Sequence, residues 1–318
     1  MAFDPLAAKQ ASRAAARAAI AAAAARRTLG QCAGDFIKSK SGEWRSGKHL
    51  AQWESTLTQH CAPIWHLPVD AIDTVAVLKV LTPIWSRIPE TASRLRGRVE
   101  AVLNFAKTKG LRDGENPAAW ADHLKFMLAK RAKESRSHHA ALPYQDVPAF
   151  IAKLRETETI AALALEFTIL TAARAGEALG ARWSEIDLAG KVWTIPAARM
   201  KAGVEHRVPL SARAAGILES LSKYRSGDFV FPGQRPGCPI GATSIRKECP
   251  ADCTIHGFRS SFRDWAGNET NTPREVAEQC LAHAIGDKAE QAYRRGDALE
   301  KRRALMEAWG AYCDRRQP

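Results

Sequence analysis

The stretch TAARAGEALGARWSEID, residues 171–187, decides the fold class of the second half of the chain. It follows an apolar segment with helical spacing, carried by Ile160, Leu163, Ala164, Phe167 and Leu170. The quoted stretch itself predicts a junction where that helix ends and a second helix begins. Arg174 stands at this junction, where the free amides of a helix end could join it in holding a phosphate.

Downstream of the junction the pattern changes from helical to strand-like. Residues 192–195 (VWTI) and 207–210 (RVPL) predict two short strands. Residues 199–203 (RMKAG) form a plausible hairpin loop between them, and helical patterns return towards the C-terminus. The sequence therefore predicts a mainly α fold with a small antiparallel sheet.

The chain divides into four predicted parts. Residues 1–27 form a helical lead-in, 28–120 a small helical domain, 121–144 a basic connector, and 145–318 a second domain with a C-terminal tail helix. Two groups of apolar residues at helical spacing support the first domain: Val75, Val77, Leu78, Val80 and Leu81, then Leu95, Val99, Val102, Leu103 and Phe105. Prolines are expected to separate its helices: Pro83, Pro89 and Pro117.

Positive charge is abundant. The 318 residues carry 47 Lys and Arg against 34 Asp and Glu, a formal net charge of +13, so a polyanionic partner such as nucleic acid is expected. The first domain contributes a cluster that is either a solvated face or a surface that follows phosphates: Arg87, Arg94, Arg96, Arg98, Lys107 and Lys109.

Other classes of protein fit less well. No run of 18 apolar residues exists, so no membrane span is expected. The Ala-rich residues 6–27 could imitate a targeting peptide, but spaced arginines favour an exposed helix. The odd count of seven cysteines indicates reduced thiols in a cytoplasm. One cysteine–histidine group could in principle hold zinc, but its spacing fits no usual zinc pattern: Cys238, Cys249, Cys253 and His256.

A set of basic and nucleophilic residues suits phosphodiester chemistry without a metal or other cofactor. Such chemistry requires an in-line nucleophile, positive charge on the phosphoryl oxygens and a proton donor for the leaving oxygen. Arginine is best suited to supply that charge, because its fork binds two oxygens. The candidates, in chain order, are Arg174, Lys201, His256, Arg259, His283 and Tyr293.

Here the sequence resembles the tyrosine recombinases, specifically prophage-type integrases. The segments that carry the resemblance are TAARAGEALGARWSEID, WTIPAARMKAGVEHRVPLS, TIHGFRSSFRDWA and LAHAIGDKAEQAYRRGDALEKRRALMEAW. They match the family's arginine box, hairpin lysine, His-x-x-Arg box, Leu-x-His box and tyrosine in order and spacing. The resemblance covers about residues 145–313 strongly, and 28–120 more loosely, where the family has a helical core-DNA-binding domain.

The resemblance implies roles for the six candidates. Tyr293 would attack the DNA backbone and form a 3′-phosphotyrosyl bond. Arg174 and Arg259 would clamp the scissile phosphate, and Lys201, with Lys191 as its rival, would be the general acid. His256 and His283 would bind phosphate and carry protons. The other tyrosines lack this order of boxes: Tyr144, Tyr224 and Tyr312.

The resemblance also implies partners. These are double-stranded DNA at attachment sites, a homotetramer on synapsed DNA, and further DNA-bending proteins and an excisionase, all in a bacterial cytoplasm. Two other functions stay open, a relaxing enzyme similar to type IB topoisomerases and a DNA-binding regulator that has lost catalysis. The C-terminal apolar stripe could pack in its own subunit or dock on a neighbour: Leu299, Leu305, Met306, Trp309 and Tyr312.

Two departures from the family are visible. The family often has Thr-Gly before its first arginine, where this chain has Thr171-Ala172-Ala173. Full-length relatives usually begin with an arm-site DNA-binding domain, whereas this sequence begins near Asp4-Pro5. We therefore expect an integrase that is truncated or naturally without that domain.

Overall fold

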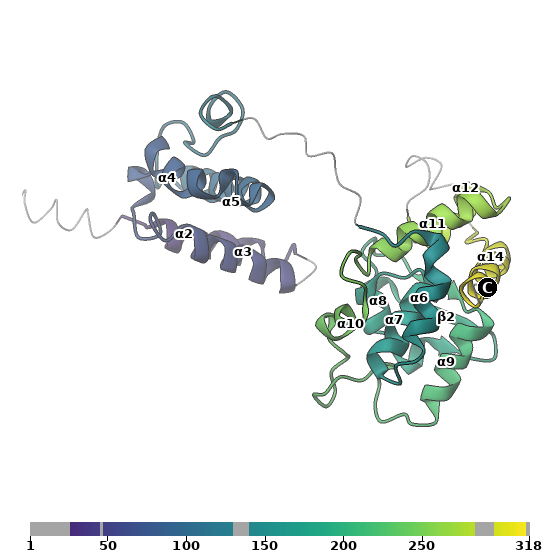
Figure 1. The fold of residues 1–318 in the computed structure, drawn as a ribbon. Coiled ribbons are helices and arrows are strands. Elements are labelled where there is room, and N and C mark those ends of the chain that lie inside the picture. Colours follow the sequence, from purple (N-terminus) through teal and green to yellow (C-terminus); the bar gives the residue numbers. More distant parts are fainter. Residues whose placement is uncertain (1–25, 45–46, 130–139, 284–295, 316–318) are drawn as a thin grey trace, which may run out of the picture. The chain divides into compact units, whose positions relative to one another are not determined.

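The computed structural model describes residues 26–44, 47–129, 140–283 and 296–315 (Figure 1). The chain forms two compact units, an N-terminal unit that ends at Ser135 and a C-terminal unit that begins at Arg136. Each unit has a hydrophobic core of its own. Almost all of the predicted lead-in at 1–27 and part of the predicted connector lie outside the described residues.

The N-terminal unit is helical, as predicted. Its α-helices are α2 (Leu29–Lys40), α3 (Gly47–His60), α4 (Thr74–Trp85) and α5 (Pro89–Thr108). Thr28 caps α2 through a capping box with Gln31, and the Asp73 carboxylate accepts a hydrogen bond from the amide of Ala76 at the start of α4. These side chains satisfy amides that a helix start leaves without partners, which is why the helices begin there.

Of the prolines expected to separate the helices of this unit, Pro89 does so and Pro83 does not. Pro89 opens α5, a position where the missing N–H costs nothing. Pro83, in contrast, lies inside α4, so the expectation that it separates two helices was wrong. It lies within the last turn of α4, which ends at Trp85, so few of the helix's hydrogen bonds lie beyond it.

The predicted basic cluster is smaller than the sequence suggests. Arg98 is only 8% exposed, donates to the carbonyl of Gln52 and lies over the ring of Trp53 at 5.2 Å. Arg96 pairs with Glu100 at 2.6 Å. These two guanidinium groups are used inside the unit, because nearby acceptors and an aromatic face stabilise a cation that is partly removed from water.

The C-terminal unit combines helices with one small sheet. Its α-helices among the described residues are α6 (Val147–Leu154), α7 (Ile160–Thr171), α8 (Ala175–Leu179), α9 (Ala212–Ser222), α10 (Ala242–Glu248), α11 (Gly257–Glu269), α12 (Arg274–Cys280) and α14 (Leu299–Cys313). The strands β1 (Ile186–Asp187), β2 (Val192–Ile195) and β3 (His206–Pro209) form an antiparallel sheet in the order β1-β2-β3. The mainly α prediction with a small antiparallel sheet is confirmed.

Helix α7 lies at the centre of this unit. Most of its residues are buried, and Phe167 contacts both Trp193 of β2 and Phe231. The C-terminal helix α14 packs beside it, and the indole of Trp309 donates to the carbonyl of Ile169 at 3.0 Å. Four residues of the C-terminal apolar stripe are buried in the core of this unit: Leu305, Met306, Trp309 and Tyr312.

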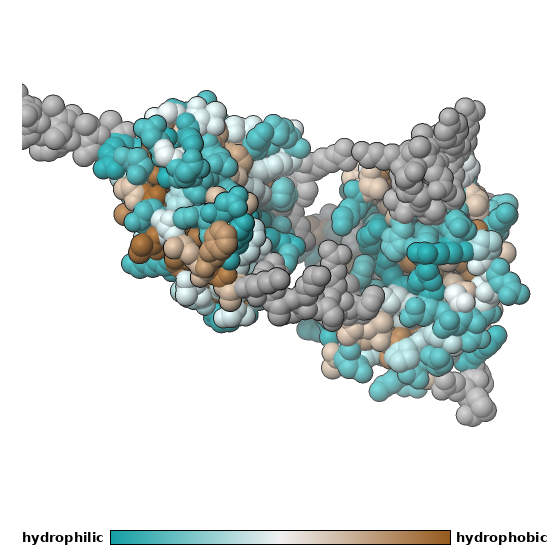
Figure 2. All heavy atoms as spheres, turned by 90° about the horizontal axis from the view of Figure 1, so that it is seen from above, coloured by the Kyte–Doolittle hydropathy of each residue, from teal (hydrophilic) through white to brown (hydrophobic). Residues whose placement is uncertain are grey.

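The described helices include none that is both long and apolar enough to cross a membrane. Hydrophilic residues predominate on the face of the C-terminal unit that Figure 2 shows.

Candidate active site

The arginine box forms the junction that the sequence predicts. Helix α7 ends at Thr171, Ala172 adopts the left-handed conformation with φ of 48°, and Arg174 is the residue directly before α8. Glu177 is 6% exposed and holds Arg174 twice. Its carboxylate accepts from the Arg174 amide at 3.0 Å and from Nη1 at 2.8 Å. This fixes a half-buried guanidinium at a helix end.

Arg259 lies on α11 and is 5% exposed. It donates to the carbonyl of Ala172 and, at 2.6 Å, to the carbonyl of Leu281, so it joins the arginine box to the end of α12. Its Nη2 is also 3.1 Å from Nε2 of His283. Burial and the neighbouring charge of Arg174 lower the pKa of Arg259 to about 10, which leaves it charged at neutral pH.

His283 is placed by the way in which α12 ends. Ala282 is left-handed, with φ of 49°, its amide donates to Gln279, and the amide of His283 donates to Glu278. This pair of hydrogen bonds is a Schellman motif, which turns the chain back over the last turn of the helix. Because Arg174 also donates to the carbonyl of Ala282 at 3.4 Å, the structure brings Arg174, Arg259 and His283 together.

His256 lies one residue before α11, and its side chain is exposed. With Arg259 and His283 it lines a cavity of about 740 Å³. His256 and Arg259, three residues apart in the sequence, thus line the same cavity. A phosphate in the cavity would meet imidazole and guanidinium donors.

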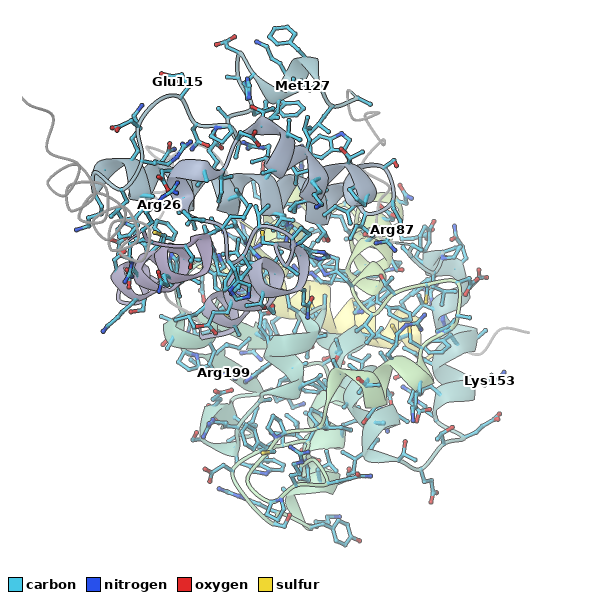
Figure 3. All side chains as sticks on the ribbon, turned by 90° about the vertical axis from the view of Figure 1, so that its left-hand side faces the viewer. Arg26, Arg87, Glu115, Met127, Lys153 and Arg199 are labelled. Atoms are coloured by element: carbon cyan, nitrogen blue, oxygen red, sulfur yellow. The ribbon has the colours of Figure 1, made fainter. Side chains whose placement is uncertain are left out.

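Lys201 is exposed on the connection between β2 and β3. Two residues earlier lies Arg199, which is labelled in Figure 3. It donates to the carbonyl of Glu177 at 2.5 Å and pairs with Glu185. Arg199 thus ties the base of this connection to the arginine box. Among the described residues, however, the contacts that join Arg174, Arg259 and His283 do not include Lys201.

Tyr293 lies outside the described residues, as do its neighbours from 284 to 295. The described residues begin again at 296, and Asp297 holds this part of the chain in place. Asp297 binds Arg207 of β3 through two contacts of 2.9 Å, and it lies 3.4 Å from Arg302, which is 1% exposed on α14. The described chain is therefore anchored before this segment at His283 and after it at Asp297.

Sequence reasoning missed several residues of this arrangement. Glu177 is one of them, although its position three residues after Arg174 is that of a capping-box carboxylate. Arg199 was treated as part of a loop, and no sequence signal marks its role. Glu278 gave no signal either, because a spacing of five from His283 is not a helical neighbour distance.

The possible zinc group does not assemble. Cys249 and Cys253 approach to 3.5 Å between their sulfurs, but Cys238 is exposed and His256 lines the cavity described above. Within the described part of the chain, no three residues among the histidines, cysteines and acidic side chains lie close enough to hold a metal ion.

Comparison with known proteins shows which family and which relatives the chain is similar to. A model described as "Phage integrase family" matches residues 141–299, and one described as "Phage integrase central domain" matches residues 29–123. The chain is 30% identical over 271 residues to prophage integrase IntA of Escherichia coli (strain K12), covering 81% of this chain and 63% of IntA. It is also 30% identical over 292 residues to prophage integrase IntZ of the same organism, covering 88% of this chain and 69% of IntZ.

Solved structures show the same fold. A lambda integrase (75–356) dimer bound to a COC′ core site matches 82% of this chain and 98% of that chain, with a TM-score of 0.63 and 18% identity. A lambda integrase tetramer bound to a Holliday junction matches 90% of this chain and 83% of that chain, with a TM-score of 0.63 and 17% identity. This chain spans less than two thirds of the length of IntA, at 63%.

Proposed function

This chain belongs to the phage integrase family, and from that premise we propose that it is a site-specific DNA recombinase that cuts and rejoins DNA through Tyr293. The observation that carries the proposal is the convergence of Arg174, Arg259 and His283 beside one cavity. The recombinase would integrate or excise a phage or a genomic island. Metal ions are not needed for this scheme, because side chains supply the positive charge.

In the proposed cleavage step, the phenol oxygen of Tyr293 attacks the scissile phosphorus. A new oxygen–phosphorus bond forms, the bond to the 5′ oxygen breaks, and a 3′-phosphotyrosyl intermediate results. The phenol proton passes to a histidine of the site. A 5′ hydroxyl of the partner strand later attacks the intermediate, so that the same step in reverse rejoins the DNA.

Arg174 and Arg259 would bind the non-bridging oxygens and stabilise charge as it develops. Among the described residues, three of the five N–H groups of Arg259 have protein acceptors, so two remain to meet a phosphate. Lys201 would give its proton to the leaving 5′ oxygen, which a guanidinium does poorly. His256 and His283 would complete the phosphate site from the rim of the cavity.

The proposed partner is double-stranded DNA carrying attachment sites, with four protomers on two synapsed duplexes. The net charge of +13 supports a DNA partner. The lambda integrase assemblies, a dimer on a core site and a tetramer on a Holliday junction, support the multimeric arrangement. DNA-bending proteins and an excisionase are further proposed partners.

A covalent adduct tests the proposal. A binding site would first be selected by letting the protein enrich duplexes from a random library. A duplex with that site and a nick prepared beside it would then be incubated with the protein and run on a denaturing gel. We expect an adduct from the wild type and none from Tyr293→Phe. Tyr224→Phe is a matched control, because Tyr224 is 82% exposed on the same unit, and it should keep the adduct.

The other outcomes separate the remaining functions. Stable binding without any adduct would contradict the proposal and indicate a regulator that has lost catalysis. An adduct together with relaxation of plasmids, but without pairing of two sites, would indicate a monomeric relaxing enzyme.

A further inference from the structure

Glu278 contacts His283 both through its side chain and through its main chain. Its carboxylate lies 2.6 Å from Nδ1 of His283, and its carbonyl accepts the His283 amide at 3.0 Å. On the opposite side of the imidazole, Nε2 lies 3.1 Å from Nη2 of Arg259. The ring is therefore held between a carboxylate and a guanidinium.

This arrangement determines which ring nitrogen carries the proton of a neutral His283. A guanidinium can only donate, so Nε2 has to accept from Arg259. An ionised carboxylate can only accept, so Nδ1 has to donate to Glu278. With the proton on Nε2 instead, two N–H groups would face each other across 3.1 Å, while Nδ1 and the carboxylate would face each other as two acceptors.

Glu278 is itself kept ionised. Burial raises the pKa of this carboxyl, but hydrogen bonds from Arg263 and His283 outweigh that effect, so its pKa lies below the usual value. Arg263 donates through Nε at 2.6 Å and lines the same cavity.

We propose that Glu278 is a positioning residue that fixes the Nδ1–H form of His283 and thereby keeps Nε2 as the atom that faces Arg259 and the substrate phosphate. The inference rests on the proposed function only for its catalytic consequence. Once Arg259 turns from Nε2 to the phosphate, Nε2 could take the phenolic proton or, when protonated, donate to a phosphoryl oxygen, while Glu278 keeps the ring in place through Nδ1.

Nitrogen NMR of the full chain with 15N-labelled histidine tests the inference without DNA. Two-bond proton–nitrogen spectra distinguish the two neutral forms, and the signals of His283 are identified as those lost in His283→Gln. At a pH where His283 is neutral, we expect Nδ1–H in the wild type and a shift towards Nε2–H in Glu278→Ala. Glu275→Ala removes an exposed carboxylate from the same helix and should leave His283 unchanged.

Two results would overturn the inference. One is an Nε2–H form in the wild type, a result that does not depend on whether Glu278→Ala folds. The other is a folded Glu278→Ala protein whose His283 signals match those of the wild type.

A second measurement connects the inference to catalysis. With the enriched, nicked duplex described above, Glu278→Ala should form the adduct at least about tenfold more slowly at saturating protein, with DNA affinity unchanged. Glu278→Asp should recover part of the rate, and Glu275→Ala should keep all of it. If the wild type forms no adduct, the proposed function fails, whereas the NMR result still decides the role of Glu278. An unchanged rate in Glu278→Ala would contradict its catalytic role.

Discussion

His206 illustrates how one half-buried side chain can make stability depend on pH. It opens β3, and burial followed by the positive charge of Arg302 lowers its pKa to about 4. An imidazole in the unfolded chain has a pKa near 6.5. As pH falls, the unfolded state therefore takes up a proton before the folded state does, and stability is lost between about pH 6.5 and pH 4.

We expect the free energy of unfolding of the C-terminal unit to fall by about 2 to 3 kcal/mol across that range through His206. Urea unfolding at several pH values would measure it. His206→Gln should flatten this part of the pH dependence, while His66→Gln, an exposed histidine of the other unit, should keep it. Equal slopes in all three proteins would show that His206 is not the cause.

Ala282 occupies a backbone conformation that favours glycine. Its φ of 49° is left-handed, which costs an alanine roughly 1 kcal/mol relative to its preferred conformations. We expect Ala282→Gly to raise the free energy of unfolding by about 0.5 kcal/mol, because the relief exceeds the entropy that glycine adds to the unfolded chain. Ala277 lies inside α12, the helix that ends just before Ala282, so Ala277→Gly should lower the free energy of unfolding by about 1 kcal/mol. Thermal unfolding of both variants would check the opposite signs.

At the scale of elements, the packing of α14 against the start of α9 depends on a glycine. A Cβ added at Gly310 would lie 2.7 Å from Cβ of Ser211 and 2.8 Å from its Oγ. The same Ser211 caps α9 by accepting from the amide of Ala214. Residue 310 therefore has to lack a side chain for the two helices to approach this closely.

We expect Gly310→Ala to destabilise the C-terminal unit by about 1 to 3 kcal/mol, because the added methyl group overpacks the contact. Gly216→Ala in α9 is the matched control, since a Cβ there meets nothing within 4 Å. It should stabilise the unit by roughly 0.5 kcal/mol, because alanine has the higher helix propensity. Chemical denaturation of the two variants gives the comparison, and a stable Gly310→Ala protein would contradict the described packing.

The elements that could be predicted are those whose pattern is local. Strand β2 has the predicted bounds, and β3 differs from its prediction by one residue. Strand β1 was not predicted, because two residues become a strand only through pairing with β2. Burial of Arg98 depends on Gln52 and Trp53, residues of another helix that no local pattern brings near.

The candidate site divides in the same way. The order and spacing of its boxes identified Arg174, Arg259 and His283, and the structure brings these residues together. The contact between Glu278 and His283 could not be predicted, because it depends on Ala282 turning left-handed at the end of α12. Alanine rarely adopts that conformation, so an alanine at position 282 does not predict a left-handed residue at the end of the helix.

At the scale of the whole molecule, charge should govern DNA affinity. With a net charge of +13, we expect binding to weaken steeply as salt rises, because each phosphate contact releases counterions. An affinity loss of at least about a hundredfold between 50 and 200 mM salt is the expected order of magnitude. Fluorescence anisotropy with a labelled duplex measures it, and a flat response would count against a DNA partner.

Cleavage itself should not depend on divalent metal. The proposed site uses arginine, lysine and histidine for the tasks that magnesium performs in metal-dependent nucleases. We expect the phosphotyrosyl adduct to form at an unchanged rate after treatment with a chelator such as EDTA. A cutting step that stops with EDTA and resumes with magnesium would refute the proposed set of residues.

The way in which Arg259 is held has a consequence for sequence divergence. Its guanidinium binds the main-chain oxygens of Ala172 and Leu281, which every amino acid possesses. Natural variants can therefore exchange residues at these two positions and keep the arginine in place, provided that the backbone keeps its path. Searches for distant members should accordingly weigh the spacing between boxes more heavily than the identity of the residues that flank them.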